Sequence, residues 1–235
     1  MQRLLILVPL FFIACAKEKS SLVNQESIFT AYSLSYDDAS KEFAAGVDFH
    51  FGGSTGTYLS LDGSSAVQFD GEAMKESSNF MNQVYYRAEK NNPAMDYAFT
   101  THSFNYTNND GKSLYNQAGL VPMPTAKYKA TSVVITEPLT VDWVTPDKIG
   151  KGTLFVNLSR TDTSKGDTVF SSGDISNSTS GTITVSSEKL RDLGAGGLNV
   201  QLCRDSFQPP SQVTQEGGTL YLKVCTTKTT VTILP

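Results

Sequence analysis

The sequence of 235 residues predicts an all-β fold made of two tandem antiparallel β-sandwiches. Charged residues make up only 18% of the chain and aromatic residues 10%, a composition that suits short strands joined by polar turns. From Ile28 onward, apolar and polar residues alternate with a period of two, which is the period of a strand with one buried face. Asp-Gly sequences between these segments supply the positive φ angles that tight turns need.

Segments with the strand period cover the first half of the chain at short intervals. They are residues 28–36, 43–51, 58–61, 66–69, 84–88, 97–104 and 113–115. Asp62-Gly63, Asp70-Gly71 and Asn109-Asp110-Gly111 lie between or beside such segments, and each favours a hairpin turn. We therefore predict an N-terminal sandwich over residues 27–121.

A segment with two prolines separates this half from the next. Pro122 and Pro124 break the alternation, and we predict a linker over residues 122–130. Further strands are predicted at 132–136, 139–144, 152–158, 168–170, 181–186, 198–205, 219–226 and 229–234. One helical turn, Ser187–Leu193, ends at Gly194. These elements predict a C-terminal sandwich over residues 131–235.

The first fifteen residues, MQRLLILVPLFFIAC, combine the basic Arg3, an apolar run and Cys15. The run is too short to span a bilayer and has the length of a signal-peptide core. The ending Phe12-Ile13-Ala14-Cys15 resembles the lipobox of bacterial lipoproteins, with Phe12 in place of the more usual leucine. This resemblance implies that residues 1–14 are removed and that Cys15 carries a diacylglyceryl group and an amide-linked chain such as palmitate. An ordinary secretory signal is the alternative.

The residues after Cys15 bear on the location of the protein. In lipoproteins, aspartate at this position tends to retain the chain in the inner membrane, so Ala16 implies the outer membrane by the same resemblance. Several acyl chains hold a protein stably at a bilayer. We predict that residues 15–26 form a solvated tether. Whether the protein faces the periplasm or the cell surface stays open.

The charge balance argues against nucleic acid as a partner. The formal net charge is −4 and becomes −5 when Arg3 is lost with the signal peptide. No basic face is therefore expected.

The two remaining cysteines predict a disulfide with a structural role. Once Cys15 is acylated, Cys203 and Cys225 form an even pair in an exported chain, where disulfides persist. The apolar residues in segments 198–203 and 220–225 occupy equivalent alternate positions. Both cysteines therefore point to the opposite, more polar face, and they can bridge if the two strands are antiparallel neighbours. Two unrelated thiols are the alternative.

The order of elements in the second half resembles that of an immunoglobulin-like domain. In that family a short helical turn packs a leucine beneath the sandwich before the strand that leads into the last hairpin. Leu190 or Leu193, followed by segments 198–203 and 219–225, fits this order. Trp143 shares a face with neighbouring apolar residues, and we expect it in the core. The first half, with FTTHSFNYTNNDGKSLYN at 99–116, resembles envelope lipoproteins of Bacteroidetes-type bacteria, whose functions are largely uncharacterised.

Two short motifs match catalytic patterns, but their context does not support catalysis. Gly52–Gly56 matches the nucleophile-elbow pattern G-x-S-x-G, which needs a following helix. A strand is predicted there instead, so the glycines are expected to form a hairpin loop. Ser186–Lys189 contains S-x-x-K, which we interpret as a helix cap. The only histidines are His50 and His102, so we predict that the protein is not an enzyme.

We predict no cofactor, and the sequence contains one set of residues that could bind a metal. Asp162, Asp167 and Asp174 lie in a polar region and offer oxygen ligands for calcium. They lack the spacing of an EF-hand, and solvated loop carboxylates are the more common outcome.

Tyrosines are the candidate binding residues. Tyr85 and Tyr86 are adjacent on one predicted strand, so one should face the core and the other the solvent. Tyr106 is the third candidate. Exposed tyrosines stack on sugars or anchor protein partners, whereas tyrosines that cover the inside of the sandwiches are the simpler alternative.

These observations predict a non-enzymatic, lipid-anchored protein of the cell envelope. It would present its β-sandwiches to an unidentified protein or glycan partner. A carbohydrate-binding module for polysaccharide capture, with a row of exposed aromatic residues, is one alternative. A carrier of lipids or other hydrophobic ligands is another, and it requires an apolar cavity within one continuous sheet.

Overall fold

The computed structural model describes residues 17–147, 152–161, 168–171 and 178–235, with the backbone alone described for 168–171. Cys15 and the three aspartates considered for calcium lie outside these residues. Within them, no helix combines the length and the apolar character needed to cross a membrane. The described elements are mostly strands, which confirms the all-β class.

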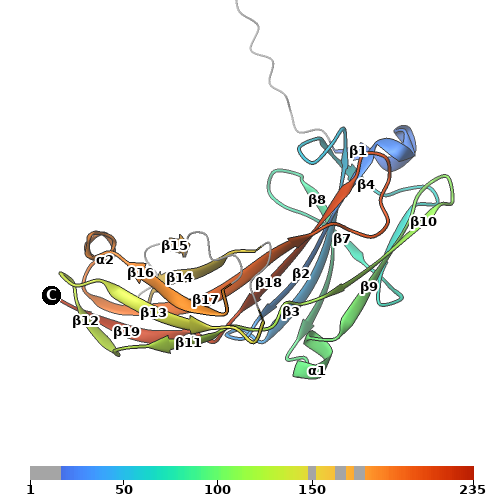
Figure 1. Ribbon diagram of the computed structural model, residues 1–235. Coiled ribbons are helices and arrows are strands. Elements are labelled where there is room, and N and C mark those ends of the chain that lie inside the picture. Colours follow the sequence, from blue (N-terminus) through green and yellow to red (C-terminus); the bar gives the residue numbers. More distant parts are fainter. Residues whose placement is uncertain (1–16, 148–151, 162–167, 172–177) are drawn as a thin grey trace, which may run out of the picture.

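The N-terminal half alternates short strands and turns (Figure 1). Its strands are β1 (Glu18–Lys19), β2 (Ile28–Asp37), β3 (Glu42–Phe51), β4 (Thr57–Ser60), β5 (Ala66–Phe69), β6 (Glu72–Ala73), β7 (Lys75–Ser78), β8 (Val84–Asn91), β9 (Thr101–Thr107) and β10 (Ser113–Gly119). Its helical turns are η1 (Ser20–Leu22), η2 (Gln25–Ser27) and α1 (Met95–Ala98).

The C-terminal half contains the remaining strands and one helix. These are β11 (Thr125–Tyr128), β12 (Ser132–Val134), β13 (Leu139–Val144), β14 (Leu154–Arg160), β15 (Thr168–Ser171), β16 (Ser180–Val185), α2 (Ser187–Leu193), β17 (Gly196–Gln208), β18 (Gly218–Cys225) and β19 (Thr229–Leu234).

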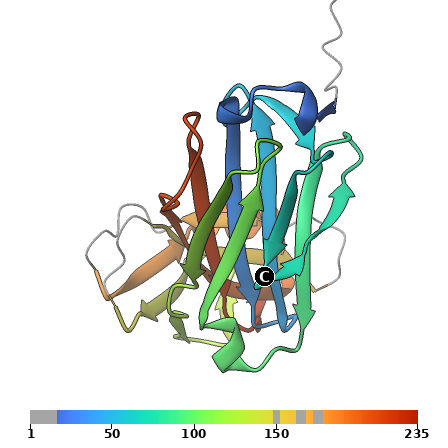
Figure 2. The same ribbon diagram turned by 90° about the vertical axis from the view of Figure 1, so that its right-hand side faces the viewer.

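One sheet runs through both halves of the molecule. Its main order is β1-β4-β3-β2-β18-β17-β14-β15, with β8 and β7 attached through β3, and β19 and β12 attached through β17. A four-stranded sheet, β10-β9-β5-β6, packs on its N-terminal part, as Figure 2 shows from the end. A three-stranded sheet, β11-β13-β16, packs on its C-terminal part.

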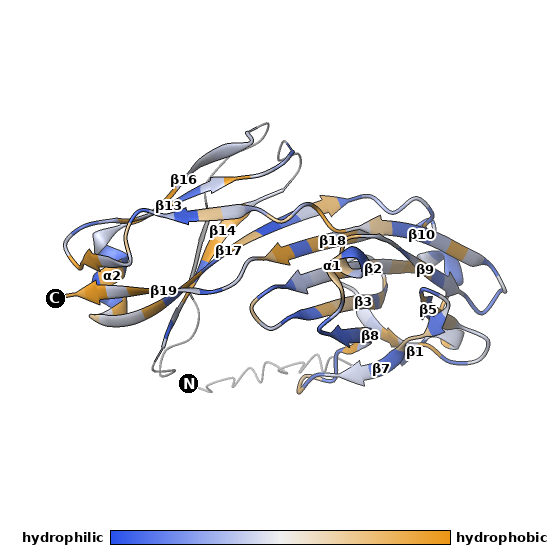
Figure 3. Cartoon of the chain, turned by 90° about the horizontal axis from the view of Figure 1, so that it is seen from below, coloured by the Kyte–Doolittle hydropathy of each residue, from blue (hydrophilic) through white to orange (hydrophobic). Residues whose placement is uncertain are grey.

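Each pair of facing sheets encloses its own hydrophobic core. The N-terminal core is rich in aromatic residues, with Tyr32, Phe49 and Phe104 among those buried. The C-terminal core is mainly aliphatic and surrounds the single tryptophan, Trp143, which is buried as expected. Figure 3 shows hydrophobic and hydrophilic positions alternating along many of these strands. The molecule is therefore two β-sandwiches that share one sheet.

The C-terminal sandwich has the immunoglobulin-like arrangement that the sequence suggested. Strands β11, β13 and β16 face β12, β19, β17, β14 and β15, and α2 connects β16 to β17, which matches the order of the two sheets in that fold. The side chain of Ser186 accepts a hydrogen bond from the Lys189 amide, and Gly194 ends the helix with a φ of 83°, so the predicted cap and stop are confirmed. Leu190 and Leu193 are both buried in the core.

Several local predictions need correction. Residues 17–26 are not the solvated tether expected over 15–26, because β1 pairs with β4 and Ser20 and Gln25 are buried. The expected strand over 97–104 begins only at Thr101, because Tyr97 and Ala98 belong to α1. Asp62-Gly63 does not close a hairpin but connects β4 in the large sheet to β5 in the four-stranded sheet. The other two turns do join paired strands, and Asp70 and Gly71 both have the positive φ that their sequence suggested.

The expected division at residues 122–130 does not separate two independent sheets. This segment contains β11, and β18 from the C-terminal half pairs in parallel with β2 along its whole length. Leu220, Leu222 and Val224 of β18 are buried in the N-terminal core. The sheets are also mixed and not purely antiparallel, because β1–β4 and β12–β19 are parallel pairs as well.

Strand β17 connects the two cores. Its first half pairs with β19 in the C-terminal sandwich, and its second half pairs with β18, which lies beside β2. Arg204 of β17 is buried and donates to both carboxylate oxygens of Asp147 at 2.7 and 3.1 Å and to the Pro122 carbonyl at 3.4 Å. The segment between the sandwiches is thus held against β17.

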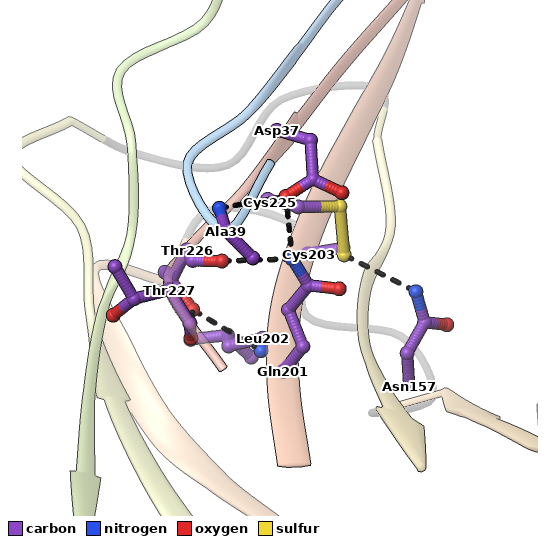
Figure 4. Close-up of a disulfide and its surroundings, with 9 residues drawn as sticks. All are labelled: Asp37, Ala39, Asn157, Gln201, Leu202, Cys203, Cys225, Thr226 and Thr227. Atoms are coloured by element: carbon purple, nitrogen blue, oxygen red, sulfur yellow. Dashed lines mark hydrogen bonds between the residues drawn. A yellow bond between two sulfur atoms is a disulfide. The ribbon is translucent and has the colours of Figure 1, made fainter. Parts of the chain in front are cut away.

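The predicted disulfide lies where β17 leaves one sandwich for the other. Cys203 and Cys225 are directly opposite each other on β17 and β18 and are bonded. The alternation predicted a polar, solvated face for both cysteines, and this is wrong. Phe155 from neighbouring β14 packs on them, and all three side chains are buried. Close by, the Gln201 amide donates to Asp37 at the end of β2 and to the Thr226 carbonyl, both at 2.8 Å (Figure 4).

Removing the disulfide is expected to destabilise the fold. The bond closes a loop across 22 residues of sequence, which corresponds to about 3 kcal/mol in the chain-entropy estimate. Replacing both Cys203 and Cys225 by alanine should lower the free energy of unfolding by this amount. Chemical denaturation followed by Trp143 fluorescence measures it, in a Cys15→Ser background that leaves no third thiol. An unchanged denaturation midpoint would contradict this role.

Candidate functional site

The outer face of the large sheet in the N-terminal half carries small side chains. Residues Ala31, Ser33 and Ser35 of β2 and Ala44 and Gly46 of β3 alternate with buried core residues. Ser33 lies opposite Gly46, and Ser35 lies opposite Ala44. A Cβ at Gly46 would come within 2.6 Å of the Ser33 hydroxyl, so even alanine there would displace that side chain. Because these side chains are short, the centre of this face is low.

Larger polar side chains surround this floor and turn it into a groove of about 360 Å³. Tyr85 and Arg87 come from β8, and Tyr58 comes from β4. Asn79 and Gln83 come from the turn between β7 and β8, and the Asn79 amide donates to the Gln83 side-chain oxygen at 2.6 Å. Hydroxyl, amide and aromatic groups therefore line the groove together.

Asp48 of β3 is the most unusual group in the groove. It lies opposite Ala31 of β2, and extending the β3–β8 register by one residue beyond the Val47–Tyr86 pair places it beside Tyr85. Burial alone raises the pKa of Asp48 to about 6, and no other described residue donates a hydrogen bond to its carboxylate or forms an ion pair with it. A partly desolvated carboxylate without a partner is a strong acceptor for a ligand hydroxyl.

The charges next to the groove do not neutralise Asp48. The Arg87 guanidinium is an ion-pair partner of Glu42, at 2.8 Å, and of Glu89. Beyond Asp48 along β3, the ring of His50 packs 4.3 Å from the ring of Tyr58. Burial lowers the pKa of His50, and a backbone hydrogen bond with Gly56 partly opposes this effect. The neutral imidazole is thus favoured at this end of the groove.

A larger hollow of about 660 Å³ lies at the open edge of the N-terminal sandwich, and two of its polar groups are already paired. The ammonium of Lys90 lies 3.7 Å from the centre of the Tyr97 ring, and the carboxylate of Asp70 is 2.7 Å from Nδ1 of His102. Glu72, which also lines this hollow, is exposed to solvent. The groove, whose carboxylate is partly buried and has no partner among the described residues, is therefore the better candidate for a ligand site.

The three tyrosines predicted as binding residues have different environments. Tyr85 is half-buried and lines the groove. Tyr85 faces outward and Tyr86 inward, which confirms that one of the pair faces the core; Tyr86 and Tyr106 are buried in the N-terminal core, so neither is an exposed binding residue. Tyr86 faces inward because it alternates with Tyr85, and its hydroxyl is occupied by the Leu61 amide and by Glu76. Tyr106 packs against Phe49, with ring centres 4.5 Å apart.

Sequence reasoning missed Asp48 and the floor of the groove. A signal for the floor was present, because two neighbouring strands carry only alanine, serine and glycine at five outward positions. Such small residues on adjacent strands leave room above a sheet. Asp48 could not be recognised, because an outward aspartate on a strand is ordinary until its burial and its lack of a partner are known.

The motifs that match catalytic patterns do not form a catalytic site. Ser54 lies in the turn between β3 and β4 and is followed by a strand, so no helix N-terminus supports it. Both ring nitrogens of buried His102 have partners, namely the Asp70 carboxylate and the Tyr97 carbonyl at 3.0 Å. Among the described residues, no three His, Cys, Asp or Glu side chains are grouped closely enough to hold a metal ion.

Comparisons with known proteins do not identify a family for this chain. No family model matches the chain, and no curated protein matches it. Murine CEACAM1b is 8% identical with a TM-score of 0.25, and the match covers 87% of this chain and 100% of that chain. The ectodomain of a teleost fish polymeric Ig receptor is also 8% identical with a TM-score of 0.25, covering 82% and 97%. Likeness at this level carries no argument about this chain.

The fold itself defines the class. The chain is an all-β protein of two β-sandwiches, of which the second has an immunoglobulin-like strand order.

Replacing Asp48 by asparagine is expected to stabilise the protein near neutral pH. The folded pKa of Asp48, about 6, lies above its ordinary value of 3.8. The folded state therefore takes up a proton between these values, and ionisation of Asp48 costs stability as the pH rises through them. Asp48→Asn should raise the free energy of unfolding at pH 7 by on the order of 2 kcal/mol.

This gain should shrink as the pH falls toward 4, because Asp48 is then protonated in the folded state and about half protonated in the unfolded state, so little ionisation penalty remains. Urea denaturation of the two chains across this range measures it. Asp110→Asn, at an exposed turn position, is the matched control and should change stability little at either pH. A gain that does not depend on pH would contradict the assigned burial of the carboxylate.

Proposed function

We propose that the chain is a lipid-anchored protein of the bacterial cell envelope and that its groove binds saccharide chains. The observation that carries the binding part is the Asp48 carboxylate, which is half-buried and has no hydrogen-bond or ion-pair partner in the part of the chain that the structure describes. It lies in a groove whose other walls supply the rings of Tyr58 and Tyr85 and the amides of Asn79 and Gln83.

A saccharide matches these groups better than an apolar ligand. Its hydroxyls donate to a carboxylate and exchange hydrogen bonds with amides, while its C–H faces pack on tyrosine rings. A carrier of hydrophobic ligands requires an apolar cavity between the sheets. In this protein aromatic side chains fill the N-terminal interior, where the rings of Tyr32 and Phe104 lie 5.2 Å apart.

Two features support the envelope location. The segment that ends in Cys15 resembles a lipobox, and the bond between Cys203 and Cys225 suits an oxidising compartment outside the cytoplasm. Acylation of Cys15 would hold the chain at the outer membrane without a membrane-spanning helix. The protein is proposed to act as a binding protein, with no cofactor and no enzymatic step.

Loss of Cys15 is expected to release the protein from the membrane. In the bacterium that makes it, the Cys15→Ser chain should move from the membrane fraction to the soluble fraction and should lack the mass of the acyl groups. Cell fractionation and mass spectrometry measure the two effects. The Cys203→Ala/Cys225→Ala chain is the control, because it loses the other two cysteines and keeps the anchor. Retention of the Cys15→Ser chain in the membrane fraction would count against acylation.

Substitution of the groove tyrosine is expected to weaken saccharide binding. A glycan array with the mature chain should identify bound oligosaccharides. For these, Tyr85→Ala should raise the dissociation constant by about tenfold, which corresponds to ~1.4 kcal/mol. Affinity should also fall as the pH drops below about 6, because protonated Asp48 is a weaker acceptor.

The matched control is Tyr115→Ala. Tyr115 is a 45% exposed tyrosine on β10, in the opposite sheet, and its loss should leave the affinity unchanged. If the array shows no bound glycan, or if Tyr85→Ala leaves the affinity unchanged, the saccharide assignment is refuted. Neither result bears on the proposed lipid anchor.

A further inference from the structure

Three segments meet at one end of the N-terminal sandwich, the end where the described chain begins. Strand β1 starts beside Leu59 of β4, and β4 pairs with the last residues of β3. The turn of residues 52–56 joins β3 to β4 at this end. Strand β8 is antiparallel to β3 and begins at Val84, so the turn of residues 79–83 lies at the same end. Figure 1 shows β1 and β4 there.

This end carries exposed apolar side chains. Phe80 is 93% exposed, and Met81 beside it is 48% exposed. Leu22, in η1 next to the start of β2, is 77% exposed, and Ile28 at the start of β2 pairs with Phe51, itself partly exposed, at the end of β3. Single exposed apolar residues are ordinary, but here two of the four, Phe80 and Met81, are adjacent at the tip of one turn, and all four lie at the same end of the sandwich.

The turn that bears Phe80 is held in a fixed shape. The Asn79 side-chain oxygen accepts hydrogen bonds from the amides of Met81, at 3.0 Å, and Gln83, at 3.1 Å. The Asn79 carbonyl accepts from the Asn82 amide, whose residue has a φ of 58°. Phe80 is therefore exposed at the tip of a turn whose backbone is held by hydrogen bonds.

The two turns at this end carry no charge of their own, whereas Glu18, Lys19 and Glu216 nearby are charged and exposed. Residues 51–57 and 79–83 contain no charged side chain. Lys17 forms an ion pair with Glu76 at 2.6 Å, and Lys112 forms one with Glu26 at 2.8 Å. Bringing this surface to an apolar boundary therefore does not require the desolvation of an isolated charge in either turn.

The length of the chain places this end close to the proposed anchor. Only two residue steps separate Cys15 from Lys17, and two extended residues span at most about 7 Å. Acyl chains on Cys15 would therefore hold Lys17 next to the bilayer. Glu76, the ion-pair partner of Lys17, is only four residues before Phe80 on β7.

We infer that this end of the N-terminal sandwich docks on the lipid bilayer, with Phe80 and Met81 inserted at the boundary between headgroups and acyl chains. This inference rests on the proposed acylation of Cys15. Inserted apolar side chains add to the hold of the lipid anchor and fix the orientation of the sandwich, so that the groove has a constant position relative to the membrane.

The test uses the mature acylated chain in vesicles of phosphatidylethanolamine and phosphatidylglycerol whose acyl chains carry bromine. Phe80→Trp places a fluorophore at the tip of the turn, and the parent chain supplies the background of buried Trp143. Bromine quenches a tryptophan only near the acyl region. The expected result is a blue-shifted emission of Trp at position 80, quenched about twofold or more at the depth of interfacial side chains.

The matched control is Phe207→Trp. Phe207 is also exposed, at 56%, but it lies away from the docking end. It pairs with Tyr221, which pairs with Ser33, and Ser33 is five residues along β2 from that end. The emission of a tryptophan at position 207 should therefore not be quenched. If the chain floats with the vesicles and position 80 stays unquenched, docking is overturned and the anchor stands. If the chain does not float and lacks the acyl mass, the proposed anchor fails and docking fails with it.

Discussion

The parallel pairing of β18 with β2 is the constraint on which the rest of the molecule depends. Eight residue pairs join these strands, although they come from opposite ends of the sequence. Through this contact Leu220, Leu222 and Val224 complete the N-terminal core, while β17, hydrogen-bonded to β18, continues into the C-terminal core. The bond between Cys203 and Cys225 and the buried Gln201 amide secure the crossing point. Neither sandwich is complete without the β17–β18 pair.

The candidate site is a consequence of the same sheet. Strand β2 is covered by β18 on one edge and by β3 on the other, so its outward residues lie at the centre of a broad face. Small side chains there leave a hollow, and β8 with its turn raises one wall. Asp48 is desolvated by this arrangement without receiving a partner. Binding sites commonly retain polar groups that lower stability in this way, because a group already hydrogen-bonded within the protein is less able to bind a ligand.

The comparison of expectation with structure separates local from long-range information. Most strand positions, the helix at Ser187–Leu193 and two of the three tight turns follow from residues close in sequence, and the structure confirms these. The parity of apolar residues was sufficient to bring Cys203 and Cys225 to one face. It was not sufficient for Tyr86 and Tyr106, because alternation shows that a strand has two faces without showing which face is covered.

The sequence by itself determined the all-β class, the alternation of each strand and the equivalent positions of the two cysteines within their strands, since these depend on a period of two and on turn residues that act locally. Only the tertiary structure decided that β18 belongs to both halves, that Tyr85 borders a groove and that Asp48 lacks a partner. Each of these depends on which strand lies beside which. That choice is set by the burial of whole faces across residues far apart in the chain, a quantity that no short segment contains.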